Sequence, residues 1–408
     1  MSVPDSGSLW RHRSFLAFFF GRTFSIIAFQ IFSVAVGWQV YALTHSTWDL
    51  GLVGLMQFLP MLLLTLIAGH VADQHDRRLI NMLAQGIYAL LAVMLMLGSA
   101  QGWLTREGIF GLAFLFGVVR AFEFPASSAM LPGLVSSEQL VPALSLTGSA
   151  RQAAFIIGPA LGGGLYVFGA TVTYAVTTAL FLLGLAGSFL IDYRQPARQR
   201  EPVTWETLIA GVAFIRRQPV LLGAISLDLF AVLLGGATAL LPVYAREILL
   251  TGPLGLGVMR AAPAVGALLM SFALARWPVE RQVGKVMFIS VAVFGLATIG
   301  FAFSTSLVLS VGLLGVLGAA DMISVVVRSA LVQLETPDDM RGRVGAVNWL
   351  FIGTSNQLGE FESGATAAAF GTVPSVALGG LGTVLVVGLF TRWFPALAKR
   401  DRLQEKHP

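Results

Sequence analysis

The sequence predicts an all-α membrane protein with twelve transmembrane helices, arranged in two pseudo-symmetric six-helix bundles. Three observations lead to this fold class. Only 12% of the 408 residues are charged, which is about half the share found in soluble domains. Apolar segments long enough to cross a bilayer recur along the whole chain. The second half of the chain also repeats the order of motifs in the first half.

The composition excludes several classes of protein. With so little charge, the chain cannot cover a folded surface with well-solvated groups, which excludes most soluble enzymes and disordered proteins. The chain has no cysteine, which excludes disulfide scaffolds, thiolate metal sites and cysteine nucleophiles. The net charge of +5 is compatible with nucleic-acid binding, but the placement of the basic residues indicates a membrane topology instead.

Twelve apolar segments divide the chain, and most of them reach the roughly 20 residues that a membrane-crossing helix requires. They are 14–43, 48–72, 79–101, 108–131, 141–168, 172–191, 219–246, 254–276, 284–303, 307–333, 343–370 and 372–395. The sequence lacks the short alternating segments of a β-barrel, so helices are the remaining way to satisfy the backbone in lipid. The first segment is not a signal peptide, because Arg22 interrupts it and no small-residue cleavage site follows.

The basic residues predict the orientation in the membrane. With the N-terminus placed in the cytoplasm, 19 of the 26 Lys and Arg residues fall in cytoplasmic segments. These are Arg11, Arg13, Arg77, Arg78, Arg194, Arg198, Arg200, Arg216, Arg217, Arg276, Arg281, Lys285, Arg341, Arg343, Arg392, Lys399, Arg400, Arg402 and Lys406. Only Arg106 and Arg246 fall on the outer side. This positive-inside bias predicts that both termini are cytoplasmic.

A polar stretch separates six spans from six. Within it, apolar residues recur at helical spacing as far as Pro219, which predicts an amphipathic helix on the inner membrane surface. We therefore predict an N-terminal six-helix bundle over 1–192, a cytoplasmic linker over 193–218 and a C-terminal six-helix bundle over 219–408.

The two halves match at an offset of about 201–203 residues. Gly54 corresponds to Gly257, and Gly158 corresponds to Gly359. Internal repeats in a polytopic chain are typical of transporters whose site lies between the repeats, near the middle of the membrane.

The loop between the second and third spans carries Gly69, Asp73, Arg77 and Arg78 in the stretch GHVADQHDRR. A glycine allows helices to approach closely, and Asp73 is expected to lie against the positive N-terminus of a neighbouring helix, the eleventh. The matching place in the second half has lost this pattern. Arg276 stands where Asp73 does, and only Gly284-Lys285 is similar.

The fifth span carries Gly158-Pro159 followed by Gly162-Gly163. Proline kinks a helix, and glycines let another helix pack closely. With the loop before the third span, this stretch resembles the signature loop and the antiporter motif of exporters of the major facilitator superfamily. The resemblance covers nearly the whole chain and is closest to the branch of proton-coupled siderophore and macrolide exporters. We expect Asp73 and Gly158-Pro159 to set the balance between inward-open and outward-open forms.

The resemblance implies a monomeric secondary transporter of the inner (plasma) membrane. It would export a small amphiphilic molecule, a siderophore or a drug-like compound, by proton antiport through alternating access. The implied partners are that substrate, protons and the lipid bilayer, with no nucleic acid and no cofactor. An importer and a lipid or glycolipid flippase of the same fold remain alternatives.

A membrane-embedded enzyme is the rival from another class. The sequence contains no HExxH, GxSxG or Walker motif, so no enzymatic activity is predicted. Its five histidines are scattered near loops and ends, so no metal site is predicted. Transport measured in vesicles would separate these classes.

Away from the ends of the spans, ten charged residues lie within them, where a charge is costly. They are Arg22, Arg120, Glu123 and Arg151 in the first half, and Asp228, Arg260, Asp321, Arg328, Glu360 and Glu362 in the second. The first half sums to +2 and the second to −2, which predicts one basic and one acidic wall for a central cavity. We expect the acids of the second half to carry the proton.

Asp228 is the first candidate for proton coupling, because no basic residue lies within one helical turn of it. The further candidates are Glu123, Asp321, Glu360 and Glu362. Arg120 and Glu123 are three residues apart and are expected to neutralise each other. Glu360 and Glu362 point about 200° apart on a helix, so only one of them is expected to line a cavity.

The substrate is expected to meet polar and aromatic groups within the spans, with the first-half arginines binding its polar or anionic part. The candidates are Arg22, Gln30, Trp38, Arg120, Arg151, Asn356 and Gln357.

Overall fold

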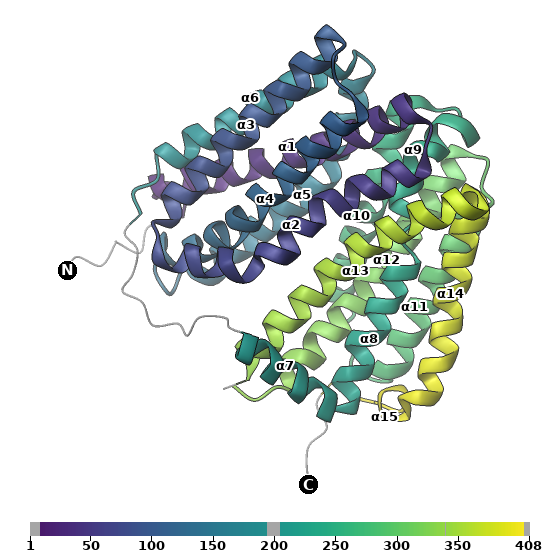
Figure 1. Ribbon diagram of the computed structural model, residues 1–408. Helices are drawn as coiled ribbons and strands as arrows, with labels where there is room; N and C mark the ends of the chain where they lie inside the picture. Colours follow the sequence, from purple (N-terminus) through teal and green to yellow (C-terminus); the bar gives the residue numbers. More distant parts are fainter. Residues whose placement is uncertain (1–8, 194–204, 339, 404–408) are drawn as a thin grey trace. The chain divides into compact units, whose positions relative to one another are not determined.

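The computed structural model describes residues 9–193, 205–338 and 340–403. All regular elements in these ranges are helices, and no strand occurs among them (Figure 1). Contacts divide the chain into two compact units. Among the described residues, unit 1 comprises 9–44 and 56–193, and unit 2 comprises 45–55, 205–338 and 340–403. Residues 194–204 of the expected linker lie outside the described residues.

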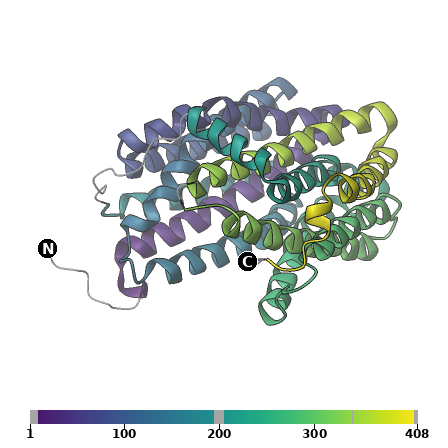
Figure 2. The same cartoon turned by 90° about the horizontal axis from the view of Figure 1, so that it is seen from below.

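Unit 1 contains most of the helices of the first half. They are η1 (Leu9–Arg11), α1 (Arg13–Thr44), α2 (Thr47–Gln74), α3 (Arg77–Gln101), α4 (Arg106–Met130), η2 (Leu131–Gly133), α5 (Leu140–Tyr166) and α6 (Ala170–Phe189). The first residues of α2, as far as Leu55, belong to unit 2. Figure 2 shows the same helices from below.

Short polar side chains begin two of these helices. Asp76 precedes α3 and its carboxylate accepts the backbone N–H of Arg78 at 2.8 Å. Thr105 precedes α4 and its hydroxyl accepts the N–H of Gly108 at 3.2 Å. Both are N-cap interactions that satisfy otherwise unpaired N–H groups. Gly102, at φ 74°, ends α3 in the left-handed conformation that glycine adopts without strain.

Unit 2 contains the helices of the second half. They are α7 (Trp205–Arg217), α8 (Pro219–Leu234), η3 (Ala237–Leu240), α9 (Leu241–Val243), the π-helical turn η4 (Tyr244–Ile248), α10 (Gly252–Arg276), α11 (Val283–Ala302), α12 (Leu307–Leu334), α13 (Arg341–Phe370), α14 (Thr372–Trp393) and α15 (Pro395–Ala398). The predicted amphipathic helix before Pro219 is confirmed as a helix, α7. It packs on α13, where Gly211 lies against the carbonyl of Arg343.

Each of the twelve predicted spans coincides with helical structure. Eleven helices of the described residues are long and apolar enough to cross a membrane. The remaining predicted span, 343–370, is the 30-residue helix α13. At about 1.5 Å per residue α13 is long enough to cross the hydrocarbon, but its polar residues lower its hydropathy. The predicted fold class is therefore confirmed.

The seventh predicted span is not one continuous helix. The α-helical geometry of α8 stops at Leu234, and 3₁₀ and π-helical turns follow Gly235 and Gly236. Gly236 lies against the carbonyl of Gly359 on α13, and a Cβ there would come 2.6 Å from that oxygen. The glycine pair thus lets the chain change direction while it touches another backbone.

Each unit has its own core. In unit 1, Phe116 stacks on Phe32 with ring centroids 3.9 Å apart, and Tyr88 stacks on both Phe116 and Phe181. In unit 2, the core gathers around Leu221, Met287 and Leu331, all fully buried. Offset aromatic pairs of this kind contribute about 0.5–1.5 kcal/mol beyond the area they bury.

Candidate functional site

A buried group of charged side chains lies inside unit 2. Asp228 of α8 forms an ion pair with Arg328 of α12, with Oδ2 and Nη2 3.2 Å apart. The hydroxyl of Ser324 donates to Asp228 Oδ1 at 3.3 Å, and Arg328 Nη1 donates to Asn348 Oδ1 of α13 at 3.1 Å. The predicted Asp228 thus has a counter-ion, which comes from another helix of its own half.

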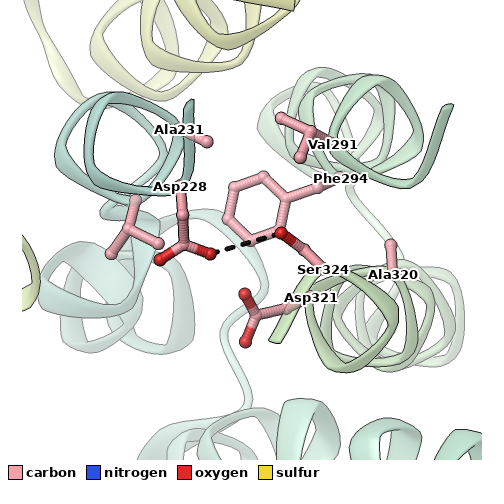
Figure 3. Close-up of a pocket in the computed structure, with 8 residues that line it drawn as sticks. Asp228, Ala231, Val291, Phe294, Ala320, Asp321 and Ser324 are labelled. Atoms are coloured by element: carbon pink, nitrogen blue, oxygen red, sulfur yellow. Dashed lines mark hydrogen bonds between the residues drawn. The ribbon is translucent and has the colours of Figure 1, made fainter. Parts of the chain in front are cut away.

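Asp321 lies next to this pair. A small cavity, of about the size of one water molecule, is lined by both carboxylates and by Ser324 (Figure 3). Its other lining residues are Ala231, Val232, Val291, Phe294 and Ala320. The charges of Asp228 and Arg328 both act on Asp321. Two carboxylates face one guanidinium, so the group would carry one negative charge in excess if both carboxylates are ionised.

Ser324 is a member of this group that was not predicted from the sequence. Asp321, Ser324 and Arg328 are three and four residues apart on α12, so they share one face of the helix. That spacing is the signal that identifies Ser324. The link between α8 and α12 has no signal in the sequence, because it depends on how the two helices pack.

A second charged pair in unit 2 involves Arg260 of α10 and Glu360 of α13. The charge of Glu360 acts on Arg260. The side chain of Glu360 also packs against Gly54, since a Cβ built on Gly54 would lie 3.0 Å from Oε2 of Glu360. Glu362 is half-buried and accepts a hydrogen bond from Thr366 of the next turn. The two glutamates therefore have different surroundings, as their spacing on the helix requires.

Unit 1 has a basic group around Arg22. The guanidinium of Arg22 on α1 donates to the hydroxyl of Ser127 on α4, and the charges of Glu123 and Arg151 act on it. Arg120 lies over the ring of Phe29, 4.2 Å from its centroid, a cation–π contact. Arg22, Arg151 and Glu123 sum to a formal charge of +1, and Arg120 adds a further positive charge to the spans of this half.

No direct ion pair between Arg120 and Glu123 is found among the described residues, and the guanidinium of Arg120 lies over the ring of Phe29. The helical spacing places both side chains on one face, but Arg120 lies over Phe29 of α1 instead. The contact with a neighbouring helix thus overrides the local spacing rule.

The remaining substrate candidates do not gather in one place. The side chain of Gln30 packs against Gly158, and Trp38 contacts Tyr166 edge-on with centroids 6.3 Å apart. Asn356 donates to the carbonyl of Ile352 on its own helix at 2.8 Å and is exposed, and Gln357 is half-buried. Arg22 and Arg151 are the candidates that the structure brings together, since the charge of Arg151 acts on Arg22.

The glycines of the fifth span hold α5 against α1. A Cβ at Gly162 would come 3.1 Å from both Ile31 Cα and Val34 Cβ, and Gly158 is pressed against Gln30. Pro159 and Gly163 are buried in the same helix. Close packing between α1 and α5 is thus the direct structural effect of this motif.

The loop before α3 connects helix ends within unit 1. Asp73 pairs with Arg77 at 3.4 Å, and Arg77 also donates to the carbonyl of Ala129 at the end of α4, at 3.1 Å. Arg78 donates to the carbonyls of Ser188 and Phe189 at the end of α6, at 3.1 and 2.7 Å.

Within unit 1, no described atom lies within 4 Å of a Cβ placed on Gly69. The contacts of this loop are instead made by its two arginines, whose long side chains reach neighbouring helices.

Among the described residues, no group of three or more His, Asp or Glu side chains is placed to hold a metal ion.

Comparisons with known proteins agree on the fold. A family model described as "Transmembrane secretion effector" matches residues 8–407. The enterobactin exporter EntS of Citrobacter koseri is 25% identical over 376 residues, which covers 92% of this chain and 90% of that protein.

Solved structures of transporters also resemble the chain. A point mutant of the nucleoside transporter NupG superimposes with a TM-score of 0.74 at 14% identity, covering 93% of this chain and 99% of that one. A bacterial homologue of the human lysosomal transporter Spinster gives a TM-score of 0.73 at 14% identity, covering 96% and 97%. At this identity the likeness concerns the fold alone.

Proposed function

The chain belongs to the transmembrane secretion effector family of the major facilitator superfamily, and on that basis we propose that it exports a small amphiphilic molecule by proton antiport. As a member of this family it is a multi-pass membrane transporter, not an enzyme. The proposed location is the inner membrane, with both termini in the cytoplasm. The proposed acting form is a monomer.

The observation that carries the coupling proposal is the group formed by Asp228, Asp321 and Arg328. Asp228 and Arg328 are buried and Asp321 is half-buried, and with both carboxylates ionised the group would carry one negative charge in excess. A net charge in a low-dielectric interior is costly, and the binding of one proton would neutralise it. The proton would bind one of the two carboxylates, and the small cavity that both of them line has room for a water that would deliver it.

The unit 1 group supports the substrate part of the proposal. Arg22 and Arg120 are held by Ser127 and Phe29, so their charges are fixed in position. Fixed guanidinium groups bind planar anionic and polar groups well. Together with the likeness to enterobactin exporters, this favours a siderophore-like substrate over a purely apolar drug.

The test is proton-driven transport in vesicles that contain the purified protein. Enterobactin is the probe, and accumulation under an imposed pH gradient is compared with counterflow without a gradient. We expect Asp321→Asn to abolish accumulation driven by the gradient while counterflow continues. Glu138→Gln removes an exposed carboxylate outside the group and is expected to behave as the unaltered protein.

Two results would overturn the coupling proposal. One is full gradient-driven accumulation in both Asp321→Asn and Asp228→Asn. The other is accumulation that requires the opposite gradient, which would indicate an importer. Movement of a labelled lipid between leaflets without enterobactin transport would support a flippase.

A second part of the proposal concerns the balance between inward-open and outward-open forms. We propose that Asp73 and the Gly158-Pro159 pair set it. The contacts of Asp73 with Arg77, and of Gly158 with Gln30, support this, because both restrain helix ends or crossings in unit 1. Distance measurements between spin labels in Asp73→Ala test it, and an unchanged distribution of distances would reject it.

A further inference from the structure

The three helix ends on one side of unit 1 are joined by arginines of a single helix. Arg77 and Arg78 stand at the start of α3. From there, Arg77 reaches Ala129 at the end of α4, and Arg78 reaches Ser188 and Phe189 at the end of α6. Basic groups at helix C-termini are stabilised by the helix dipole and by the unpaired carbonyls there.

In unit 2 the equivalent helix ends belong to α11, α12 and α14. The start of α11 carries no basic pair at the corresponding place, because only Gly284-Lys285 remains of the pattern. The three ends are nevertheless joined. The connecting residues come from the segment that follows α14, Pro395–Leu403, which we name the C-terminal strap. In Figure 2 it is the yellow segment next to the label C.

The strap caps the start of α11. The N–H groups of Val283 and Gly284 donate to the carbonyls of Asp401 and Arg400, at 3.2 and 3.0 Å. The N–H of Gln282 donates to the carboxylate of Asp401 at 3.2 Å. Three N–H groups at a helix N-terminus are thereby satisfied, and a negative charge is placed at the positive end of the helix dipole.

Glycine is required at position 284. A Cβ there would collide with the carbonyl of Leu397 in α15. The side chain of Leu397 is itself fully buried in the unit 2 core. The strap is thus anchored at one end by an apolar side chain and lies in backbone contact with α11.

Arg400 joins the strap to the end of α12. Its guanidinium forms an ion pair with Glu335, the C-cap residue that follows α12. It also donates to the carbonyls of Arg402 and Leu403, at 2.9 and 3.2 Å, and only 9% of the residue is exposed. A carboxylate at a helix C-terminus is repelled by the dipole, so Glu335 depends on a cation there.

We propose that the C-terminal strap performs in unit 2 the role that the basic pair of the loop before α3 performs in unit 1, with Arg400 as its positioning residue. In unit 1 the basic pair joins the start of α3 to the ends of α4 and α6. In unit 2 the strap joins the start of α11 to the ends of α12 and α14. The arginines belong to the start of α3 in unit 1, whereas Arg400 belongs to the segment after α14 in unit 2. The strap keeps α11, α12 and α14 in register as the transporter changes conformation.

The first test is amide hydrogen exchange of the full-length protein in detergent, which needs no substrate. We expect Arg400→Gln to speed exchange at Gln282, Val283 and Gly284 by roughly tenfold or more, because a charge-assisted contact is lost. Amides of α3 in unit 1 serve as the internal reference. Arg402→Gln is the matched control, because only the backbone carbonyl of Arg402 takes part.

If Arg400→Gln does not fold, Asp401→Asn provides a milder second variant. It keeps the size of the side chain and removes only the charge at the α11 N-terminus. We expect severalfold faster exchange at the same three amides. Unchanged exchange in both variants, or equal acceleration in Arg402→Gln, would overturn the proposal.

The second test separates positioning from stability. The maximal rate of enterobactin export per folded molecule is expected to fall severalfold in Arg400→Gln while KM stays the same, and Arg400→Lys is expected to recover part of the rate. A loss that only follows the amount of folded protein would show that the strap has no part in transport. If enterobactin is not transported at all, the amide-exchange result still decides the structural part of the proposal.

Discussion

Asp228 of α8 and Arg328 of α12 form an ion pair 3.2 Å long in the interior of unit 2, and the two residues are only 5% and 2% exposed. Their partners Ser324 and Asn348 complete a hydrogen-bonded group. The desolvation of two charges offsets much of their attraction, so a buried pair contributes little net stability but is costly to break.

A first prediction concerns the removal of one partner. We expect Arg328→Met to lower the free energy of unfolding by about 3–5 kcal/mol, because Asp228 is then buried without a counter-ion. The double variant Asp228→Leu with Arg328→Met is expected to be close to the unaltered protein. Thermal unfolding in detergent measures both. Equal losses in the single and the double variant would contradict this account.

A second prediction concerns the crossing of α1 and α5. Gly162→Val places a side chain where even a Cβ lies 3.1 Å from Ile31 Cα. We expect a loss of about 1–3 kcal/mol in the free energy of unfolding, as overpacked interiors show. Gly148→Val on the same helix is the matched control, since nothing lies within 4 Å of a Cβ there. Similar losses at both positions would indicate an effect of helix propensity instead.

A third prediction concerns the end of α6. Arg78→Gln removes the charged donor that the carbonyls of Ser188 and Phe189 share. We expect unfolding of unit 1 to become easier by about 2 kcal/mol, because hydrogen bonds to charged groups are worth about 1.5–3 kcal/mol. Arg281→Gln, at an exposed position, is the comparison. Chemical denaturation followed by near-UV circular dichroism measures the difference, and no difference between the variants would refute it.

A fourth prediction concerns Arg22. Ser127 holds the guanidinium of Arg22 in place, and we propose that this group contacts the substrate. We therefore expect Arg22→Gln to raise the KM for enterobactin about tenfold, because one charged contact with the substrate is lost. Coupling to the pH gradient should persist, since the unit 2 group is unaltered. Initial rates over a range of enterobactin concentrations provide the measurement, with the exposed Arg13→Gln as control. An unchanged KM would remove Arg22 from the substrate site.

A fifth prediction concerns topology. The chain has no cysteine, so single cysteines introduced at exposed loops report their own side of the membrane. We expect a cysteine at Glu138 to react with a membrane-impermeant maleimide only from the cytoplasmic side, and one at Glu107 only from the outside. The reverse pattern would invert the predicted orientation.

The sequence predicts the helices better than their connections. Spans are predicted well because about 20 apolar residues in lipid have few alternatives to a helix. The break in span seven was not predicted, because Gly235-Gly236 also occurs within continuous membrane helices. At the break, Gly236 lies against the backbone of Gly359 on α13, a tertiary contact that the sequence does not reveal.

The sequence identified most residues of the candidate site but not which of them interact with each other. Costly intramembrane charges identified Asp228, Asp321 and Arg328 from the sequence. Asp228 has no basic neighbour along α8, and its partner lies on α12, where only the packing of the two helices brings it close. The same holds for Arg120. Its spacing along α4 suggested Glu123 as a partner, whereas in the structure the guanidinium of Arg120 lies over the ring of Phe29 on α1.

The capping of α11 has a consequence for biosynthesis. Gln282 and Asp401, which share a hydrogen bond, are 119 residues apart. As domains generally fold in order while the chain emerges from the ribosome, unit 1 can complete its contacts at α6 before most of unit 2 exists. The start of α11 must instead wait, with its N–H groups uncapped, until residue 401 has been translated. A ribosome stalled before that codon would therefore leave unit 2 inserted but unfinished.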